Sequence, residues 1–123
     1  MPKSVHDDVL DAALNVIKDN ADRVIACTDI PANYAGVAAV SLADVAVDTT
    51  DFTIANGDVS GRKITVAAQP TVPVDATGEF DHLVIVDDTG SRVLLVTTGT
   101  AQTLTAGNTA NFPAFDYELP DPA

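Results

Sequence analysis

HLVIVDDTGSRVLLVTT, residues 82–98, is the stretch that decides the fold. Two apolar runs, 83–86 and 93–96, flank a polar connection that contains Asp and Gly. Short runs rich in Val, Ile and Leu on either side of such a turn predict two antiparallel strands of a hairpin. Both runs are continuously apolar, so the sequence predicts that the hairpin is buried on both faces and lies at the centre of a sheet, not at its edge.

Length and composition predict a single folded unit with a mainly β core. The chain has 123 residues, of which 46% are apolar and 20% charged, and this balance argues against intrinsic disorder. Aromatic residues amount to only 5%, so Val, Leu, Ile and Ala must build the core. The abundance of Val and Thr favours strands.

The net charge of −12 argues against two classes of partner. With 18 acids against 6 bases, the chain lacks a basic patch that could neutralise phosphates, so we expect no nucleic acid partner. It also lacks a polybasic segment for anionic lipid, an apolar run near the roughly 20 residues that span a bilayer, and the pattern of a signal peptide. We therefore expect a soluble protein, made in a cytoplasm, that binds no membrane.

Residues 4–20 (SVHDDVLDAALNVIKDN) predict the one clear helix, with Ser4 as its N-cap. One face is apolar at helical spacing and is formed by Val9, Leu10, Ala13, Leu14, Val16 and Ile17; Asp8, Asp11, Asn15 and Asp19 lie opposite and are expected in solvent. The apolar stripe must cover either the protein's own sheet or a neighbouring subunit, and the general packing of layers favours the sheet. The stripe is wide enough to leave a flank for a neighbour, which makes Val9, Leu10, Leu14 and Ile17 the candidate interaction residues.

The fold class predicted from these patterns is mainly β (α+β). An N-terminal amphipathic helix, within residues 1–22, precedes a compact antiparallel β-sandwich or small barrel of about seven strands in 23–123. The two parts are expected to form a single folded unit. A second hairpin is predicted at 51–68 around Asn56-Gly57, because Asn-Gly is a strong turn signal.

Other segments are less regular. Residues 36–47 are ambiguous between a helical turn and a strand, because periodicity does not decide between them. A Pro-containing crossing segment is predicted at 69–79, and the last two strands are predicted at 99–106 and 111–119.

Candidate chemistry is sparse. Cys27, the only cysteine, lies in an apolar run and is expected to be a buried, inert thiol that forms no disulfide. Asp87-Asp88 superficially resembles a calcium loop but lacks the alternating acids of one. A second set of acids could converge in space, although turn aspartates mostly bond local backbone: Asp44, Asp48, Asp51 and Asp58. His6 and His82 are expected to be ordinary polar residues. The sequence thus predicts no catalytic residue, metal or cofactor, and an enzyme is the weaker class.

The pattern of the chain resembles a family of small structural proteins of tailed bacteriophages. The resemblance lies in LVTT (95–98), AQTLTAGN (101–108), FPAF (112–115) and PDP (120–122), together with HDDVLDAALNVIKDNA (6–21), SLADV (41–45) and DFTIANGDVSGRKITVAA (51–68). It covers nearly the whole chain and is one of overall pattern, without catalytic motifs. One departure is Gly99, where relatives are expected to have a larger residue.

The resemblance, to virion or head-associated proteins, implies a component of the virion, made in the host cytoplasm, and does not fix its place in the particle. Its acidic charge would be repelled by packaged DNA, which favours the outside of the particle. The leading hypothesis is a capsid decoration protein that binds the major capsid protein or other virion proteins and forms a homo-oligomer. A neck, tail or fibre-attachment component is the alternative of the same class, and a host-surface or carbohydrate-binding module is the alternative of another class.

Overall fold

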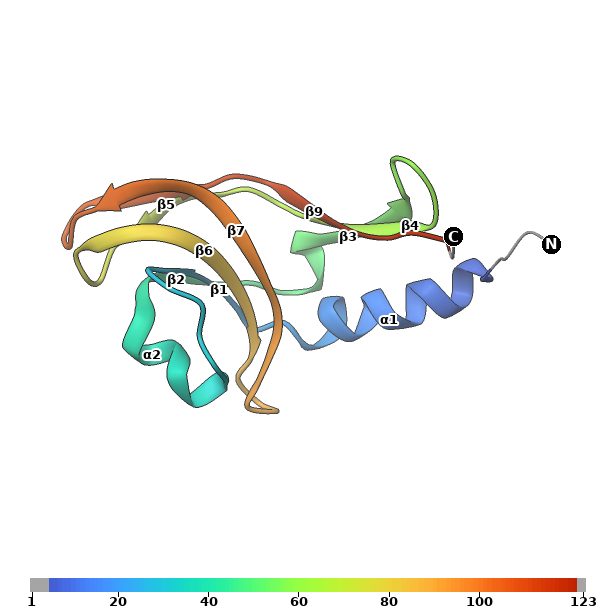
Figure 1. Ribbon diagram of the computed structural model, residues 1–123, viewed down its shortest axis with the longest axis horizontal. Coiled ribbons are helices and arrows are strands. Elements are labelled where there is room, and N and C mark those ends of the chain that lie inside the picture. The colour runs from blue at the N-terminus through green and yellow to red at the C-terminus, as the bar shows by residue number, and fades with distance from the viewer. Residues whose placement is uncertain (1–4, 122–123) are drawn as a thin grey trace.

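Nine strands and two α helices make up most of residues 5–121, the part of the chain that the computed structural model describes (Figure 1). In chain order they are α1 (Asp7–Asn20), β1 (Arg23–Cys27), α2 (Val37–Val40), β2 (Ser41–Ala46), β3 (Phe52–Asn56), β4 (Arg62–Val66), β5 (Gln69–Pro73), β6 (Gly78–Asp87), β7 (Arg92–Leu104), β8 (Thr109–Phe112) and β9 (Phe115–Leu119). Two 3₁₀ turns, Tyr34–Gly36 and Thr49–Asp51, precede α2 and β3. The strand pairs are antiparallel, so the predicted fold class, mainly β behind an N-terminal helix, is confirmed.

The largest sheet has the strand order β2-β1-β6-β7. β6 lies in its interior, and its residues Leu83, Val84, Ile85 and Val86 are at most 3% exposed. Their side chains alternate between two apolar clusters. Leu83 and Ile85 belong to the main core, while Val84 and Val86 join a smaller cluster that includes Val37 of α2. β6 is therefore buried on both faces, as its continuous apolar run predicts.

β7 lies at the edge of this sheet, so the prediction that both strands of the 82–98 hairpin are central is wrong for β7. β7 pairs with β6 on one side, and its apolar run Val93–Val96 is only half-buried. A continuous apolar run reports on the two faces of a strand and carries no information on whether the strand has one neighbour or two. β7 is also longer than predicted, because the strand expected at 99–106 continues it through a bulge opposite Asp81.

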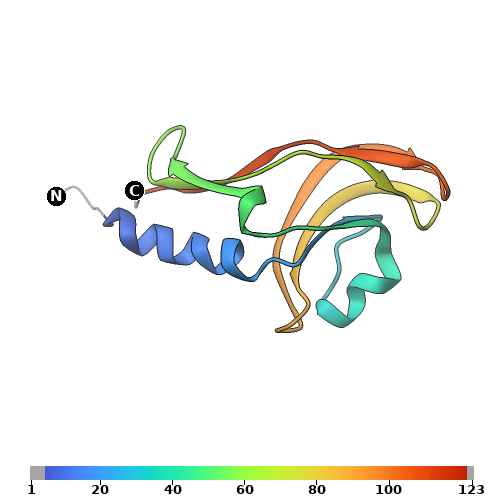
Figure 2. The same ribbon diagram turned by 180° about the vertical axis from the view of Figure 1, so that it is seen from behind.

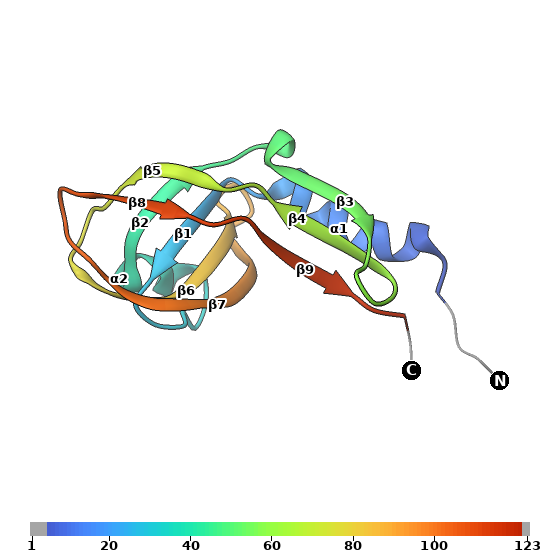
Figure 3. The same cartoon turned by 90° about the horizontal axis from the view of Figure 1, so that it is seen from above.

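β4 and β5 pair with β9 and β8 to form one long ribbon that crosses the large sheet (Figure 3). The register carries over from one pair to the other, since Val66 opposes Phe115 and Gln69 opposes Phe112, and it shifts within the β5–β8 pair between Gln69 and Val72. The β5–β8 end lies over the large sheet, and the β4–β9 end carries β3 as a third strand. The β3–β4 hairpin confirms the prediction for residues 51–68.

The strand count exceeds the predicted value of about seven because three segments each add one strand, while the merger of 99–106 with β7 removes one. The supposed crossing segment 69–79 contains β5, and Pro113 separates 111–119 into β8 and β9. The ambiguous segment 36–47 is both a helical turn, α2, and a strand, β2. The sheets remain open, so the barrel alternative is wrong.

α1 packs against β3 and β4 at the end of the core remote from α2 (Figure 2). Leu14 is fully buried and Ile17 is 6% exposed, and both belong to the main core cluster. The N-terminus of α1 is capped by His6, whose Nδ1 accepts the N–H of Asp8 at 3.0 Å. The predicted cap, Ser4, lies outside the described residues. The helix thus covers part of the protein's own sheets.

Candidate functional site

β7 presents an open strand edge along one side of the molecule (Figures 1 and 3). The hydrogen bonds of residues 5–121 include none to the backbone of residues 93–103 beyond those of the pairing with β6. Backbone N–H and C=O groups on the outer side of an edge strand are able to pair with another strand. We call this surface, the outer side of residues 93–104, the β7 edge.

The β7 edge is uncharged. The chain has no charged residue from Val93 to Phe115, although one residue in five is charged over the whole sequence. The solvent-exposed side chains on β7 beyond Arg92 are small or neutral: Thr98, Thr100, Ala101, Gln102 and Thr103. This surface is not among the sequence-based predictions, although the run of 23 residues without a charge marks it in the sequence.

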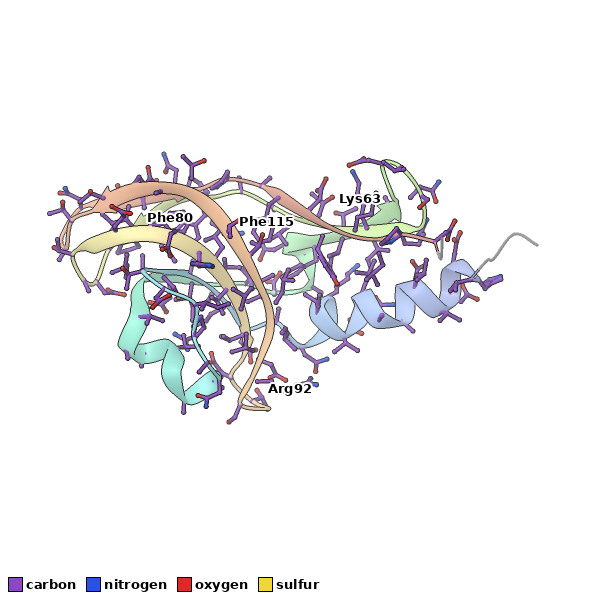
Figure 4. All side chains as sticks on the ribbon, viewed as in Figure 1. Lys63, Phe80, Arg92 and Phe115 are labelled. Atoms are coloured by element: carbon purple, nitrogen blue, oxygen red, sulfur yellow. The ribbon has the colours of Figure 1, made fainter. Side chains whose placement is uncertain are left out.

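A groove of about 320 Å³ runs beside the β7 edge. Phe80 and Leu83 of β6 line it, together with Thr97 of β7 and with Pro113 and Phe115 from the β8–β9 region. Phe80 and Phe115 are labelled in Figure 4. Apolar and neutral side chains thus border the open edge on the side of the main core.

A second candidate region is an ion-pair network around Arg23. Its Nε and Nη2 donate to the two carboxylate oxygens of Asp88 at 2.8 Å each, and its Nη1 donates to Asp44 at 3.2 Å. Tyr34 donates its hydroxyl to Asp88 at 2.7 Å. The bidentate bond from Arg23 is the main reason that the pKa of Asp88 lies below its usual range. The network joins β1, β2 and the β6–β7 turn.

Asp87, at the end of β6, is 4% exposed. Its carboxylate accepts the N–H of Gly90 at 2.9 Å and Nε of Arg92 at 3.0 Å. The bond from the Gly90 backbone is the largest of the effects that lower the pKa of Asp87, and Arg92 adds to it. The Asp87-Asp88 turn therefore uses its carboxylate oxygens to hold its own hairpin and the neighbouring strand.

The four aspartates that could have converged form no single cluster, and only Asp48 and Asp51 meet, in the capping box of one 3₁₀ turn. Asp44 binds Arg23, Asp48 and Asp51 cap the same 3₁₀ turn, and Asp58 binds Lys63 at 2.8 Å. Lys63, labelled in Figure 4, also contacts Asp116 at 3.2 Å. Across residues 5–121, no three His, Cys, Asp or Glu side chains are grouped so that they could hold a metal ion.

One carboxyl pair stands out from the rest. Asp75, in the connection between β5 and β6, has its pKa raised by the adjacent carboxyl of Asp44, with desolvation as a smaller cause. An open hollow of about 380 Å³ lies beside it, lined also by Arg23, Tyr34 and Ser41. The single guanidinium of Arg23 is shared among the acids of this region, which leaves the Asp44–Asp75 pair incompletely neutralised.

The candidate interaction residues on α1 separate into two groups. Leu14 and Ile17 are buried and serve the protein's own core, whereas Leu10 is only half-buried. Val9 is 62% exposed and Val16 is 44% exposed, so one flank of the apolar stripe does remain in solvent. Asp11, on the predicted polar face, is turned toward β4 instead.

Asp11 was expected in solvent with Asp8 and Asp19, and this expectation is wrong. Its Oδ1 accepts Nε of Arg62 on β4 at 2.7 Å, and its side chain is only 25% exposed. Helical periodicity places Asp11 next to Leu10 and Leu14, at the border of the buried stripe, where a cation on the facing strand can reach it. Asp8 and Asp19 are exposed, as predicted.

Cys27 is fully buried, which confirms its predicted environment. Burial is the main cause that raises its pKa to about 11, and the nearby charge of Asp81 adds to it. His82 lies opposite Cys27 in the β1–β6 register, but the His82 ring is bonded to Asp81 at 2.6 Å. A thiol that remains protonated in an apolar cluster is a poor nucleophile.

No helix in the described part of the chain has the length and apolar character required to cross a membrane. Comparisons with protein-family models, with curated proteins and with solved structures each find no match.

Proposed function

We propose that this protein is a structural component of a tailed-bacteriophage virion and that it decorates the outer face of the head shell. The observation that carries the proposal is the resemblance of the chain to small phage structural proteins, above all in residues 95–122. The proposed partner is the major capsid protein, with other virion proteins next to it. The protein acts by binding and assembly, not by catalysis.

The charge of the chain supports a position outside the shell. A protein with a net charge of −12 is repelled by the phosphates of packaged DNA, and the repulsion is strongest at the short distances inside a filled head. On the outer surface the same charge keeps the protein soluble and prevents binding to nucleic acid.

The arrangement of the ionisable side chains supports binding over catalysis. The least exposed carboxylate, that of Asp87, is held by Arg92 and by the Gly90 backbone, and Asp88 is held by Arg23 and Tyr34. These bonds keep the pKa values of both carboxyls low, so each stays ionised and bonded within the protein at neutral pH. A general acid or base needs a pKa shifted toward neutrality instead, and Asp75, whose pKa is raised by Asp44, is the carboxyl that moves in that direction.

The copy number per particle tests the proposal. Virions of the phage that encodes the chain should contain hundreds of copies, measured by gel densitometry against the major capsid protein. About a dozen copies or fewer, the number set by the ring symmetry of a neck or tail, would favour the neck, tail or fibre-attachment alternative. Absence from purified virions would contradict a virion role and leave a host-surface or carbohydrate-binding module as the next hypothesis.

A binding assay separates attachment from mere presence. The purified protein should co-sediment with heads that lack it and saturate at a fixed ratio to the major capsid protein. Expanded heads without DNA serve as the matched control, because binding to the outer face is independent of the packaged genome. Binding that requires the genome would contradict the outer placement.

A further inference from the structure

We infer that two copies of this chain pair antiparallel along the β7 edge, so that β7 becomes an interior strand of one sheet that continues through both copies. The inference adds a partner, a second copy of the chain, to the proposed function. Only the role of this dimer in a virion rests on the proposed function.

The apolar run of β7 is incompletely covered in the single chain. This run, Val93–Val96, has no alternation, which is typical of a strand covered on both faces by neighbouring elements. In the single chain, however, these four residues are only half-buried, whereas the equivalent run Leu83–Val86 on β6 is at most 3% exposed. A strand added beyond β7 removes this difference, because it brings side chains against both faces of the run.

The other long edge of the same sheet is covered. On β2, the carbonyl of Leu42 accepts the N–H groups of Asp75 and Ala76 at 2.7 and 3.1 Å, and Ala43 forms a bridge with Val74. The connection between β5 and β6 therefore occupies the outer side of β2. No segment of the described chain does the same for β7.

The remaining strand edges carry features that prevent pairing with another chain. β5 contains Pro70 and Pro73, and β9 carries Asp116 and Glu118. β3 and β8 are short, with five and four residues. Charges, prolines and short length are the usual protections of an exposed edge. β7 has 13 residues and, after Arg92, neither charge nor proline. Two bulges interrupt it and leave Leu95–Thr98 as its regular stretch.

Charge identifies the occupant as a second copy. Two copies, each with a net charge of −12, repel one another over most of their surfaces and can approach only where charge is missing. The run from Val93 to Phe115 provides such a surface. In a dimer with a two-fold axis, the neutral β7 edge of one copy pairs with the same edge of the other copy, so that neither edge stays open. A basic partner would gain nothing from an edge without charge.

The regular part of β7 limits the length of the pairing. Leu95 to Thr98 oppose Ile85 to His82 in unbroken register, and bulges follow on either side of this stretch. Leu95 and Thr97 face the main core, and Val96 and Thr98 face the opposite side of the sheet. Core-facing side chains of an added strand would lie over the groove lined by Phe80 and Phe115. Bulges commonly end a stretch of pairing, so we place the contact at Leu95–Thr98.

Light scattering after size exclusion tests the pairing. At high protein concentration the wild type should show twice the 12.7 kDa mass of the chain. Thr98→Lys places a charge in the contact and should raise the dimer dissociation constant about tenfold or more. Thr53→Lys is the matched control, because Thr53 is an exposed threonine on β3 and the change in net charge is the same. It should leave the dimer unchanged.

Two results would overturn the inference: a wild-type mass of 12.7 kDa at every concentration, or a dimer that Thr98→Lys leaves as strong as before. Circular dichroism checks that the variant is folded.

Amide exchange of the wild type provides a readout without substitution, since the outward amides of Leu95–Thr98 should be protected at high concentration and exchange faster on dilution. Exchange that is independent of concentration would also contradict the pairing.

The dependence of the dimer dissociation constant on salt concentration distinguishes this neutral contact from an electrostatic one. Because the two copies carry the same charge, added salt screens their repulsion and should lower the dimer dissociation constant. A dissociation constant that rises with salt would contradict the neutral contact. A dimer in solution combined with absence from virions would remove the proposed function and leave the pairing intact. A virion-bound monomer would do the reverse.

Discussion

The ring of Phe80 on β6 fills the space that a side chain at position 99 of β7 would occupy. A Cβ built on Gly99 would lie 2.5 Å from Cζ of Phe80, well inside van der Waals contact. Phe80 is 6% exposed and belongs to the main core, so its ring has little room to withdraw. Glycine at this point lets the backbone of the bulge approach the ring. The departure from the larger residue expected in relatives therefore has a structural reason in this chain.

Gly99→Ala should destabilise the protein by about 1–3 kcal/mol, because the added methyl group overpacks the contact with Phe80. The measurement is the midpoint and slope of urea unfolding. Gly36→Ala is the control, since a Cβ there meets only Asn33 Oδ1 at 3.5 Å. Combining Gly99→Ala with Phe80→Leu should recover part of the loss. Strictly additive effects would show that the two residues do not compete for the same space.

Val84→Asp should unfold the protein or cost several kcal/mol, because Val84 is fully buried in the smaller apolar cluster and the charge would have no partner. Leu94→Asp should cost less, since Leu94 lies on the edge strand and is half-exposed. Thermal melting of both variants checks the order, with Val59→Asp, at a residue 90% exposed, as the neutral control. Equal losses from the two core-side variants would contradict the edge position of β7.

Leu14→Ala should cost about 2–5 kcal/mol, the usual range for a fully buried leucine. Val9→Ala, on the exposed flank of the same helix, should change the free energy of unfolding by less than about 0.5 kcal/mol. Urea unfolding of both variants measures the difference. Deleting α1 altogether should therefore expose the core next to β3 and β4. A stable, cooperatively folded deletion variant would show that α1 is dispensable for the fold.

Acid should destabilise the folded state through Asp87 and Asp88. Both carboxyls have pKa values below the usual range, so the folded protein binds these protons more weakly than the unfolded chain. Their contribution is complete above about pH 4, near the unfolded pKa, and is lost as the pH falls through the folded values. Asp75 acts in the opposite direction, because its raised pKa means that protonation relieves its repulsion with Asp44.

Denaturant midpoints at neutral pH and near pH 3 separate these contributions. Asp87→Asn should lower the midpoint at neutral pH and reduce its fall in acid. Asp75→Asn should raise the midpoint at neutral pH. The exposed Asp19 provides the control, and Asp19→Asn should leave the fall of the midpoint in acid as in the wild type. If the midpoint of Asp87→Asn falls in acid as much as that of the wild type, the role assigned to that carboxylate is refuted.

Cys27 should resist thiol reagents in the folded protein. The thiol is fully buried and its pKa is raised to about 11, so little thiolate exists near pH 8 and access is blocked. Reaction with an aromatic disulfide, followed by absorbance, should be slow until denaturant unfolds the chain. Rapid stoichiometric labelling under native conditions would contradict both the burial and the inert assignment.

The candidate surface could be recognised only in part from the sequence. The absence of charge over Val93–Phe115 is a property of the sequence itself, and so is the apolar run that predicts burial of both faces. Neither pattern reports where a strand lies in its sheet. The pairing of Asp11 with Arg62 was also out of reach, because 51 residues separate the partners and only the packing of α1 on β4 brings them together.

The sequence by itself determined the mainly β class, the N-terminal helix, the two hairpins and the buried position of Cys27. These follow from local properties, namely periodicity, turn residues and apolar runs, which act over a few neighbouring residues. Only the tertiary structure decided the strand order, the edge position of β7 and the division of the helix stripe between core and solvent. These depend on which segments distant in sequence cover one another, and no local pattern encodes that choice.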